Sequence, residues 1–350
     1  MLHGGDIYGI LQQRGQKEKN WIDFSANINP MGMPESLKRA MEESIEFIRH
    51  YPDPLCRELA HKISIAEGVK EYEILCGNGA ADLIFRLVYA LKPKRVLLVA
   101  PTFLEYEEAL KQVDAHIDYY FLNDKLEIEP GIVEHIKKDT DMVFICNPNN
   151  PTGILTGVEL LESILKKAKE VNSYLIMDEC FLDFVSKKED YSLLSYIEEH
   201  DNLFLLKSFT KMYGIPGLRL GYMIHNNVAL LEKIRQAGQT WSVNTIAQRV
   251  GIAALMEEGF VEKTVTYVTK EREYLIQELE AMGLTVYRGH ANYLLFYRDN
   301  LEELYERLLE RGIIIRRCSN YMGLTKNHYR IAVRKHTENK YLIRTLKDMI

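Results

Sequence analysis

The sequence predicts an α/β fold in which a mostly parallel sheet forms a large body and a smaller α+β unit follows it. In the middle of the 350-residue chain, short apolar runs alternate with longer amphipathic stretches. This alternation is typical of βαβ units whose sheet is buried on both faces. After about Asn226 the pattern changes to longer helical stretches and short strands, as in a segregated α+β unit.

The first forty residues are too few for a domain and include an extended stretch, Asp23–Pro30, so we expect an arm that packs on one of the two bodies. Six strands are predicted next: Val96–Ala100, His116–Phe121, Met142–Cys146, Tyr174–Met177, Leu203–Leu206 and Leu220–Ile224. Four helical stretches lie between them: Ala81–Leu91, Glu105–Gln112, Gly157–Val171 and Ser192–Glu199.

The C-terminal part begins with a long helical stretch from Thr245 towards Ala281. Strands follow at Leu284–Tyr287, Tyr293–Phe296, Ile313–Arg316 and Tyr329–Val333, with helices near Leu301–Arg311 and Asn339–Met349. We therefore predict three parts: residues 1–44 as the arm with a portion of the small domain, 45–235 as the large domain, and 236–350 as the small domain.

Composition and charge exclude several classes of protein. The 47% of hydrophobic and 27% of charged residues are ordinary for a globular protein and rule out a disordered chain. The chain has 44 Lys and Arg residues and 50 Asp and Glu residues, which gives a net charge of −6. This charge does not indicate a nucleic acid or an anionic membrane as a partner.

The cysteines and the first residues indicate the cellular compartment in which the protein is expected. Five cysteines (56, 76, 146, 180 and 318) lie far apart without a C-x-x-C pair, so we interpret them as reduced thiols and expect no metal site. The opening residues MLHGGDIYGI lack the basic and apolar regions of a signal peptide, and the longest apolar runs are strand-sized. We expect a soluble, cytoplasmic protein.

Two polar motifs directly follow predicted strands. In Asn147–Gly153 (NPNNPTG), two prolines and a glycine end the strand sharply and display Asn150 at its carboxyl edge, where ligands bind in open α/β sheets. Asp178 follows the next strand, and a half-buried acid there needs a cation or a hydrogen bond. Taken singly, the first motif is also compatible with a plain turn and the second with a helix N-cap.

Two further motifs supply a lysine and an anion-binding loop. The segment Ser208–Tyr222 (SFTKMYGIPGLRLGY) follows a strand and places Ser208, Thr210, Lys211 and Arg219 within twelve positions; its arginine could hold a phosphate. The segment Cys76–Asp82 (CGNGAAD) precedes a helix whose free N–H groups could bind an anion. A glycine loop by itself is a weak signal.

Together, these four motifs resemble those of the fold-type I pyridoxal-phosphate enzymes, the aspartate-aminotransferase superfamily, over nearly the whole chain. The resemblance implies a large domain with a mostly parallel seven-stranded sheet, a smaller α+β C-terminal domain, and pyridoxal 5′-phosphate as cofactor. It implies that Lys211 forms a Schiff base with the cofactor, Asp178 pairs with the pyridine nitrogen, Asn150 bonds the ring hydroxyl and Phe103 stacks on the ring.

The same resemblance assigns residues to the cofactor phosphate: Gly79, Ala80, Ala81, Ser208, Thr210 and Arg219. Tyr51 in the segment HYPDP resembles a tyrosine that reaches this phosphate from the other subunit of a homodimer. The residue types suit the chemistry. A lysine amine can be exchanged for a substrate amine, a carboxylate keeps the ring nitrogen protonated, and a phosphate cradle fixes the ring.

Five segments narrow the resemblance to the L-threonine-O-3-phosphate decarboxylase family of cobalamin biosynthesis, close kin of the histidinol-phosphate aminotransferases. They are His3–Ile7, Asp23–Pro30, Trp241–Asn244, Arg316–Ser319 and Tyr329–Arg334. The aminotransferases often have tyrosine where this chain has Phe181, usually lack the H-G-G start, and commonly read R-I-T-V-G instead of R-I-A-V-R.

This narrower resemblance implies that Arg330 binds the substrate carboxylate and Arg316 the substrate phosphate, with further contacts from His3, Gly4, Asn27 and Asn150. An arginine fork at each end suits a phosphoamino acid. Arg317 stands where the family usually has an acid, and its charge either strengthens phosphate binding or faces solvent. Arg316 and Arg334 are also compatible with surface or interface positions.

We therefore expect a decarboxylase that converts L-threonine O-3-phosphate to (R)-1-amino-2-propanol O-phosphate and CO₂. The alternative is a histidinol-phosphate aminotransferase that uses 2-oxoglutarate, because the same residues serve both reactions and the orientation of the substrate decides between them. A pyridoxal-phosphate-binding regulator is a distant alternative, since it would normally carry a DNA-binding module for which the chain has no room. A scaffold without catalysis would not need Lys211, Asp178, Asn150 and Arg219.

Overall fold

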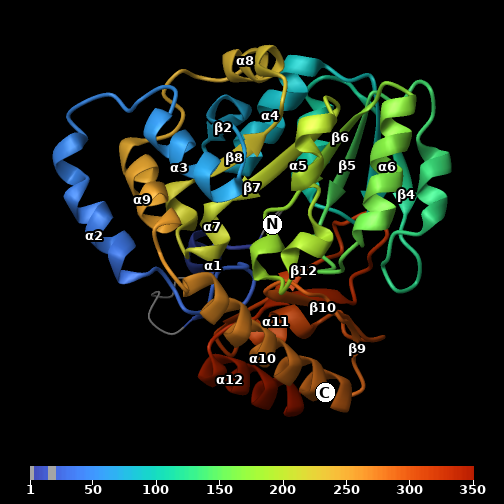
Figure 1. Cartoon of the computed structure of the whole chain (residues 1–350). Coiled ribbons are helices and arrows are strands. Elements are labelled where there is room, and N and C mark those ends of the chain that lie inside the picture. Colours follow the sequence, from blue (N-terminus) through green and yellow to red (C-terminus); the bar gives the residue numbers. More distant parts are fainter. Residues whose placement is uncertain (1–3, 15–20) are drawn as a thin grey trace.

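The computed structural model describes residues 4–14 and 21–350. Its largest element is a seven-stranded sheet with the strand order β2-β8-β7-β6-β5-β3-β4 (Figure 1). The strands are β2 (Ile74–Gly77), β3 (Arg95–Ala100), β4 (His116–Phe121), β5 (Met142–Cys146), β6 (Tyr174–Asp178), β7 (Leu203–Ser208) and β8 (Gly221–Ile224). Only β8 runs antiparallel to its neighbours, so the predicted mostly parallel seven-stranded sheet is confirmed.

Helices cover both faces of this sheet, and alternate strand residues point to each. On β5, Phe144 packs with α4 (Ala80–Leu91), α5 (Leu104–Lys111) and α8 (Val228–Gln236). Its neighbours Val143 and Ile145 pack with α3 (Arg57–Glu67) and α6 (Val158–Glu170) on the other face. Burial on both faces explains why β5 is a continuous apolar run.

The C-terminal part lies below the large sheet in Figure 1. It contains a four-stranded antiparallel sheet, β12-β13-β10-β9. Its elements are β9 (Thr285–Tyr287), β10 (Tyr293–Tyr297), β11 (Ile313–Ile314), β12 (Arg316–Arg317), β13 (His328–Ala332), α10 (Phe260–Ala281), α11 (Leu304–Leu309) and α12 (His336–Lys347). The smaller C-terminal α+β unit is thereby confirmed.

The N-terminal residues join this smaller unit. A short strand, β1 (Ile22–Asp23), pairs in parallel with β11. Beyond it, α2 (Glu35–Glu43) packs against α9 (Thr245–Leu255), which also contacts α3. The remaining helix of the arm is α1 (Ile7–Arg14). The domain boundaries at residues 44 and 235 stay a prediction.

Several predicted elements differ from the structure. The single helix expected from Thr245 to Ala281 is two helices, α9 and α10, because the chain turns at Gly259 with a φ of 68°. The strand expected at Ile313–Arg316 is divided, since β11 pairs with β1 whereas β12 pairs with β13. The helix expected at Ser192–Glu199 is a short 3₁₀ helix, Leu194–Glu199.

Other elements had no prediction. They are α1, α2, α3, α8, β1 and β2, together with the one-turn helix α7 (Phe209–Met212) and 3₁₀ helices at Ile45–Phe47, Glu71–Glu73, Pro130–His135, Leu182–Phe184, Lys188–Tyr191 and Pro216–Leu218. Among the helices of the described residues, none combines the length and apolarity needed to cross a membrane.

Candidate active site

A cavity of about 390 Å³ opens at the carboxyl ends of β5, β6 and β7. It is lined by Ala80, Ala81, Phe103, Glu105, Cys146, Asn150, Asp178, Cys180, Phe181, Lys211 and Arg219. Seven of these residues were predicted to bind the cofactor, although they come from five separate segments of the chain. The structure therefore brings the predicted cofactor residues together, while their individual roles stay a prediction.

Asp178 ends strand β6 and is buried in the cavity wall, 4% exposed. The hydroxyl of Tyr106 donates a hydrogen bond to its Oδ2 atom at 2.6 Å, and the backbone N–H of Cys180 donates one to Oδ1 at 3.0 Å. The carboxylate is thus held from two sides while it remains on the cavity surface. A buried carboxylate in this position can pair with a cationic ring nitrogen.

Lys211 lies on α7, directly after strand β7. Ser208 caps this turn, because its Oγ accepts a hydrogen bond from the backbone N–H of Thr210 at 3.3 Å and lies 2.8 Å from the Thr210 hydroxyl. The lysine Nζ lies 5.6 Å from the centre of the Phe181 ring. The amine is therefore presented to the cavity beside an aromatic face.

The opposite end of the cavity has the shape of an anion cradle. Gly79, with a φ of 82°, precedes α4, and a Cβ atom on it would lie 2.5 Å from Nη2 of Arg219. A Cβ atom on Gly221 would lie 2.6 Å from the backbone nitrogen of Ala80. The two glycines let the guanidinium and the N-terminal N–H groups of α4 converge, which suits a phosphate. The donor set therefore fits pyridoxal 5′-phosphate.

A second cavity of about 460 Å³ adjoins the first and shares five lining residues with it: Phe103, Asn150, Phe181, Lys211 and Arg219. The predicted substrate residues Gly4, Asn27 and Arg330 line it. Arg330 donates from Nη1 to Oδ1 of Asn150 at 2.6 Å and from Nη2 to the carbonyl of Ser25 at 2.9 Å.

Two buried polar atoms at this second cavity lack a hydrogen-bond partner within the described part of the chain: Oδ1 of Asn27 and Nε of Arg330. Buried polar groups in folded proteins are nearly always satisfied. These two atoms therefore suit a site in which a bound polar ligand supplies the missing hydrogen bonds. His3, the remaining predicted substrate residue on the N-terminal segment, lies outside the described residues.

Arg316 sits behind the wall of the second cavity, and the structure does not place it among the lining residues. It is 4% exposed, pairs with Arg330 across β12 and β13, and donates from Nη2 to Oδ1 of Asn320 at 2.9 Å. Its guanidinium lies 5.4 Å from the ring centre of Tyr321, which lines the cavity.

The neighbouring arginines point elsewhere. Arg317 is half exposed and forms an ion pair with Glu306 at 3.3 Å, so its charge faces solvent. Arg334 forms an ion pair with Glu338 at 2.8 Å. Tyr51 is 78% exposed and stacks on Trp241 at 4.4 Å, away from the cavities of its own chain. Its predicted role in a second subunit stays a prediction.

Sequence reasoning missed several residues of the site. Glu105, Cys146 and Cys180 line the first cavity, and Tyr106 holds Asp178. The spacing of Phe103 and Tyr106, one helical turn apart, was the available signal for the tyrosine. Burial raises the pKa of Cys180 well above its ordinary value, which keeps this thiol protonated.

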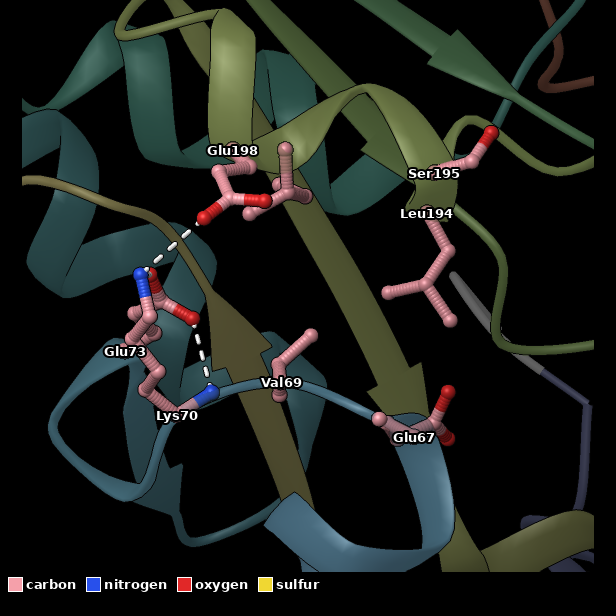
Figure 2. Close-up of a pocket in the computed structure, with 9 residues that line it drawn as sticks. Glu67, Val69, Lys70, Glu73, Leu194, Ser195 and Glu198 are labelled. Atoms are coloured by element: carbon pink, nitrogen blue, oxygen red, sulfur yellow. Dashed lines mark hydrogen bonds and ion pairs between the residues drawn. The ribbon is translucent and has the colours of Figure 1, made fainter.

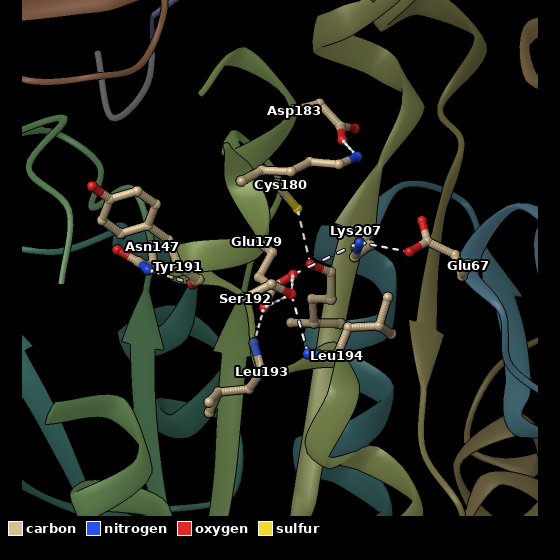
Figure 3. Close-up of polar contacts among 12 residues, drawn as sticks. Glu67, Asn147, Glu179, Cys180, Asp183, Tyr191, Ser192, Leu193, Leu194 and Lys207 are labelled. Carbon is tan, nitrogen blue, oxygen red and sulfur yellow. Dashed lines mark hydrogen bonds and ion pairs between the residues drawn. The ribbon is translucent and has the colours of Figure 1, made fainter. Parts of the chain in front are cut away.

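A buried cluster of charges surrounds Lys207 on strand β7, four residues before Lys211 (Figure 3). Lys207 forms ion pairs with Glu67 at 2.8 Å and Glu179 at 3.7 Å, and Ser192 donates to Glu179. Burial alone would lower the pKa of Lys207, but the carboxylates of Glu67, Glu179 and Asp183 raise it above its ordinary value. The cluster ties the ends of α3 and β6 to β7, the strand that precedes Lys211.

A separate surface pocket of about 310 Å³ lies next to this cluster (Figure 2). Its charged side chains are engaged with one another: Lys70 pairs with Glu198 at 3.2 Å, and Glu73 accepts the backbone N–H of Lys70. The pocket therefore presents satisfied ion pairs, unlike the two cavities around Lys211.

Comparisons with known proteins agree with this geometry. The family model for aminotransferase class I and II matches residues 19–346. The chain is 37% identical to a threonine-phosphate decarboxylase of Salmonella typhimurium over 99% of the chain and 96% of that protein. It is 32% identical to a histidinol-phosphate aminotransferase of Caldanaerobacter subterraneus over 93% of the chain and 92% of that protein.

Among solved structures, the histidinol-phosphate aminotransferase from Clostridium acetobutylicum superposes with a TM-score of 0.88 at 33% identity. The match covers 93% of this chain and 98% of that one. The similarity in fold therefore extends over nearly the whole chain, as the similarity in sequence does.

Proposed function

Because the chain belongs to the class I and II aminotransferase family and its cofactor is pyridoxal 5′-phosphate, we propose that it decarboxylates L-threonine O-3-phosphate. The products are (R)-1-amino-2-propanol O-phosphate and CO₂, a step of cobalamin biosynthesis. The observation that carries the proposal is the 37% identity to a threonine-phosphate decarboxylase over nearly the whole of both chains.

The cofactor, when bound, supplies an electron sink for the electron pair that departing CO₂ leaves on Cα. The amine of Lys211 would hold the cofactor, and when it is free it could deliver a proton to Cα of the substrate. Asp178 presents a negative charge to the ring nitrogen from a position fixed by two hydrogen bonds. Phe103 borders the same cavity and would stack on the ring.

The substrate would lie in the adjoining cavity with its carboxylate on Arg330, whose guanidinium is anchored by Asn150 and Ser25. Its phosphate, which is dianionic or nearly so, would be attracted by Arg316. Arg316 does not line the cavity, but its guanidinium lies 5.4 Å from the ring centre of Tyr321, which does. Two arginines at fixed positions orient the substrate, and orientation decides which bond at Cα breaks.

Histidinol-phosphate aminotransferase is the second candidate. It is favoured by the close superposition on the Clostridium acetobutylicum structure. An aminotransferase would use the same lysine and carboxylate but would remove the proton of Cα. The substrate pose, rather than the residue set, separates the two reactions.

The test incubates the purified holoenzyme with L-threonine O-3-phosphate and follows CO₂ release, in parallel with histidinol phosphate plus 2-oxoglutarate and glutamate formation. We expect CO₂ only. Lys211→Ala should give no product in either reaction, whereas Lys166→Ala, an exposed lysine on α6, should retain full activity. Glutamate formed without CO₂ would establish the aminotransferase instead.

We also propose a homodimer in the cytoplasm. The large apolar side chains of Phe47, Ile48, Tyr51 and Leu55 are exposed close together in the sequence, and the exposed Trp241 stacks on Tyr51. We call these five residues the apolar patch and propose that they lie in an interface, as exposed apolar side chains that gather commonly do. The patch contains Tyr51, which would reach the cofactor phosphate of a second copy. All five cysteines are unpaired, which suits a reducing compartment. A small molecule is the expected ligand, and we expect no nucleic acid partner.

A further inference from the structure

We propose that Tyr106 is a positioning residue that holds the Asp178 carboxylate in the orientation needed to pair with the pyridine nitrogen of the cofactor. The inference rests on the proposed binding of pyridoxal 5′-phosphate by Asp178, and it does not depend on which substrate the enzyme uses. Tyr106 does not line the cavity, so it would act through Asp178 alone.

The tyrosine itself is rigidly held. It is fully buried, its ring stacks on Phe144 with centres 4.8 Å apart, and the edge of Phe103 meets it at 5.5 Å. Close packing of this kind restricts the movement of a ring. The hydroxyl therefore occupies a fixed point, 2.6 Å from Oδ2 of Asp178.

The hydrogen bond has one direction. Burial, followed by the nearby Asp178 charge, raises the pKa of Tyr106 well above its ordinary value. The hydroxyl therefore stays protonated and donates a hydrogen bond to the carboxylate. The backbone N–H of Cys180 satisfies the other oxygen. Without the tyrosine hydroxyl, Oδ2 would lose its donor in a buried setting, and the carboxylate could turn about its last torsion.

Helix α5 couples this anchor to the ring-stacking residue. Phe103 is the N-cap of α5, and Tyr106 is the third residue of the helix. One turn thus supplies the aromatic face of the cofactor site and the support of the carboxylate that meets the ring nitrogen. A shift of α5 would move both contacts together.

The test measures cofactor affinity without substrate. Apoenzyme of the wild type, Tyr106→Phe, Asp178→Asn and the double variant is titrated with pyridoxal 5′-phosphate, and the dissociation constant is read from visible absorbance. We expect Tyr106→Phe to weaken binding about tenfold, the size of a hydrogen bond to a charged group. In the Asp178→Asn background, Tyr106→Phe should weaken cofactor binding less than twofold, because the carboxylate charge that Tyr106 orients is absent.

The matched control is Tyr329→Phe, which also removes a fully buried hydroxyl, one that donates to the carbonyl of Leu301 at 2.8 Å. It should leave cofactor affinity unchanged. Equal losses from Tyr106→Phe in both backgrounds would overturn the proposal, as would apoenzyme that no longer folds, since either result assigns Tyr106 to the stability of the core. Failure to decarboxylate L-threonine O-3-phosphate would leave these titrations unaffected and would instead count against the proposed function.

Discussion

At the scale of single residues, Arg316 and Arg317 are neighbours with opposite surroundings. Arg316 is buried beside Asn320 and behind Tyr321, whereas Arg317 pairs with Glu306 at the surface. Side chains alternate along a strand, so consecutive arginines of β12 cannot share one environment. Of these two arginines, only Arg316 lies near a residue that lines the second cavity, Tyr321.

We expect Arg316→Gln to raise the KM for the phosphorylated substrate about tenfold or more, because a charged hydrogen bond to the phosphate is lost. Arg317→Gln should change KM less than twofold. Steady-state kinetics of both variants checks this, with cofactor affinity measured as a control for folding. Equal effects of the two changes would show that the phosphate is bound elsewhere.

At the scale of elements, the close approach of β8 to the start of α4 defines the anion cradle. Gly221 leaves no room for a side chain, because a Cβ atom would lie 2.6 Å from the Ala80 nitrogen and 2.9 Å from the Lys207 carbonyl oxygen. Both contacts are backbone atoms of fixed elements. The strand and the loop can therefore relieve the clash only by moving apart.

We expect Gly221→Ala to destabilise the fold by about 1–3 kcal/mol, the range of overpacking substitutions, and to weaken cofactor binding. Gly131→Ala is the matched control, since nothing lies within 4 Å of a Cβ atom on Gly131. Urea unfolding and cofactor titration of both variants provide the measurement. A Gly221→Ala protein with unchanged affinity would mean that the cradle tolerates separation of the two elements.

The β7–β8 pair also contains a pH-sensitive group. His225 is fully buried against Phe204, and burial lowers its pKa from 6.5 to about 4. The unfolded chain binds a proton below pH 6.5 that the folded protein takes up only near pH 4. Stability is therefore complete above pH 6.5 and falls as the pH drops, by about 3 kcal/mol at pH 4.

His225→Phe should remove this part of the pH dependence, although it also removes the hydrogen bond between Nδ1 and the Leu203 carbonyl. The measurement is the free energy of unfolding in urea from pH 4 to 7. Between pH 7 and pH 4, the free energy of unfolding of the wild type should fall by about 3 kcal/mol more than that of the variant. Parallel curves would indicate that the imidazole titrates normally in the folded protein.

At the scale of the whole molecule, Phe47, Ile48, Tyr51 and Leu55 lie in the segment between α2 and α3, and Trp241 lies just before α9. These three helices are on the left in Figure 1. We expect Ile48→Glu to convert a dimer to monomers, because it places a charge within an apolar interface. The monomer should also bind the cofactor more weakly, as it would lack Tyr51 of a second copy.

The matched control is Phe121→Glu at the end of β4, the edge strand at the other end of the sheet. This change should leave both the oligomeric state of the protein and its affinity for the cofactor unchanged. Sedimentation velocity with parallel cofactor titration tests both variants. A wild-type protein that is monomeric at micromolar concentration, yet binds cofactor tightly, would contradict the assignment of Tyr51.

The sequence by itself determined the parallel sheet and the central residues of the site. Buried strands are continuous apolar runs, and Asn150, Asp178 and Lys211 follow such runs within a few residues. The loop before α4 could also be predicted, since glycines directly before an amphipathic helix can be recognised in a short stretch of sequence. The edge strand β2 had no prediction, although it is as long as β8.

Only the tertiary structure decided which distant side chains complete these local motifs. Tyr106 and Asp178 are separated by 72 positions, and Arg330 and Asn150 by 180, so no spacing along the chain reports either bond. The division of the predicted strand at residues 313–316 likewise follows from its partners, β1 and β13. Periodicity reflects burial of one segment, whereas hydrogen bonds between segments depend on packing of the whole chain.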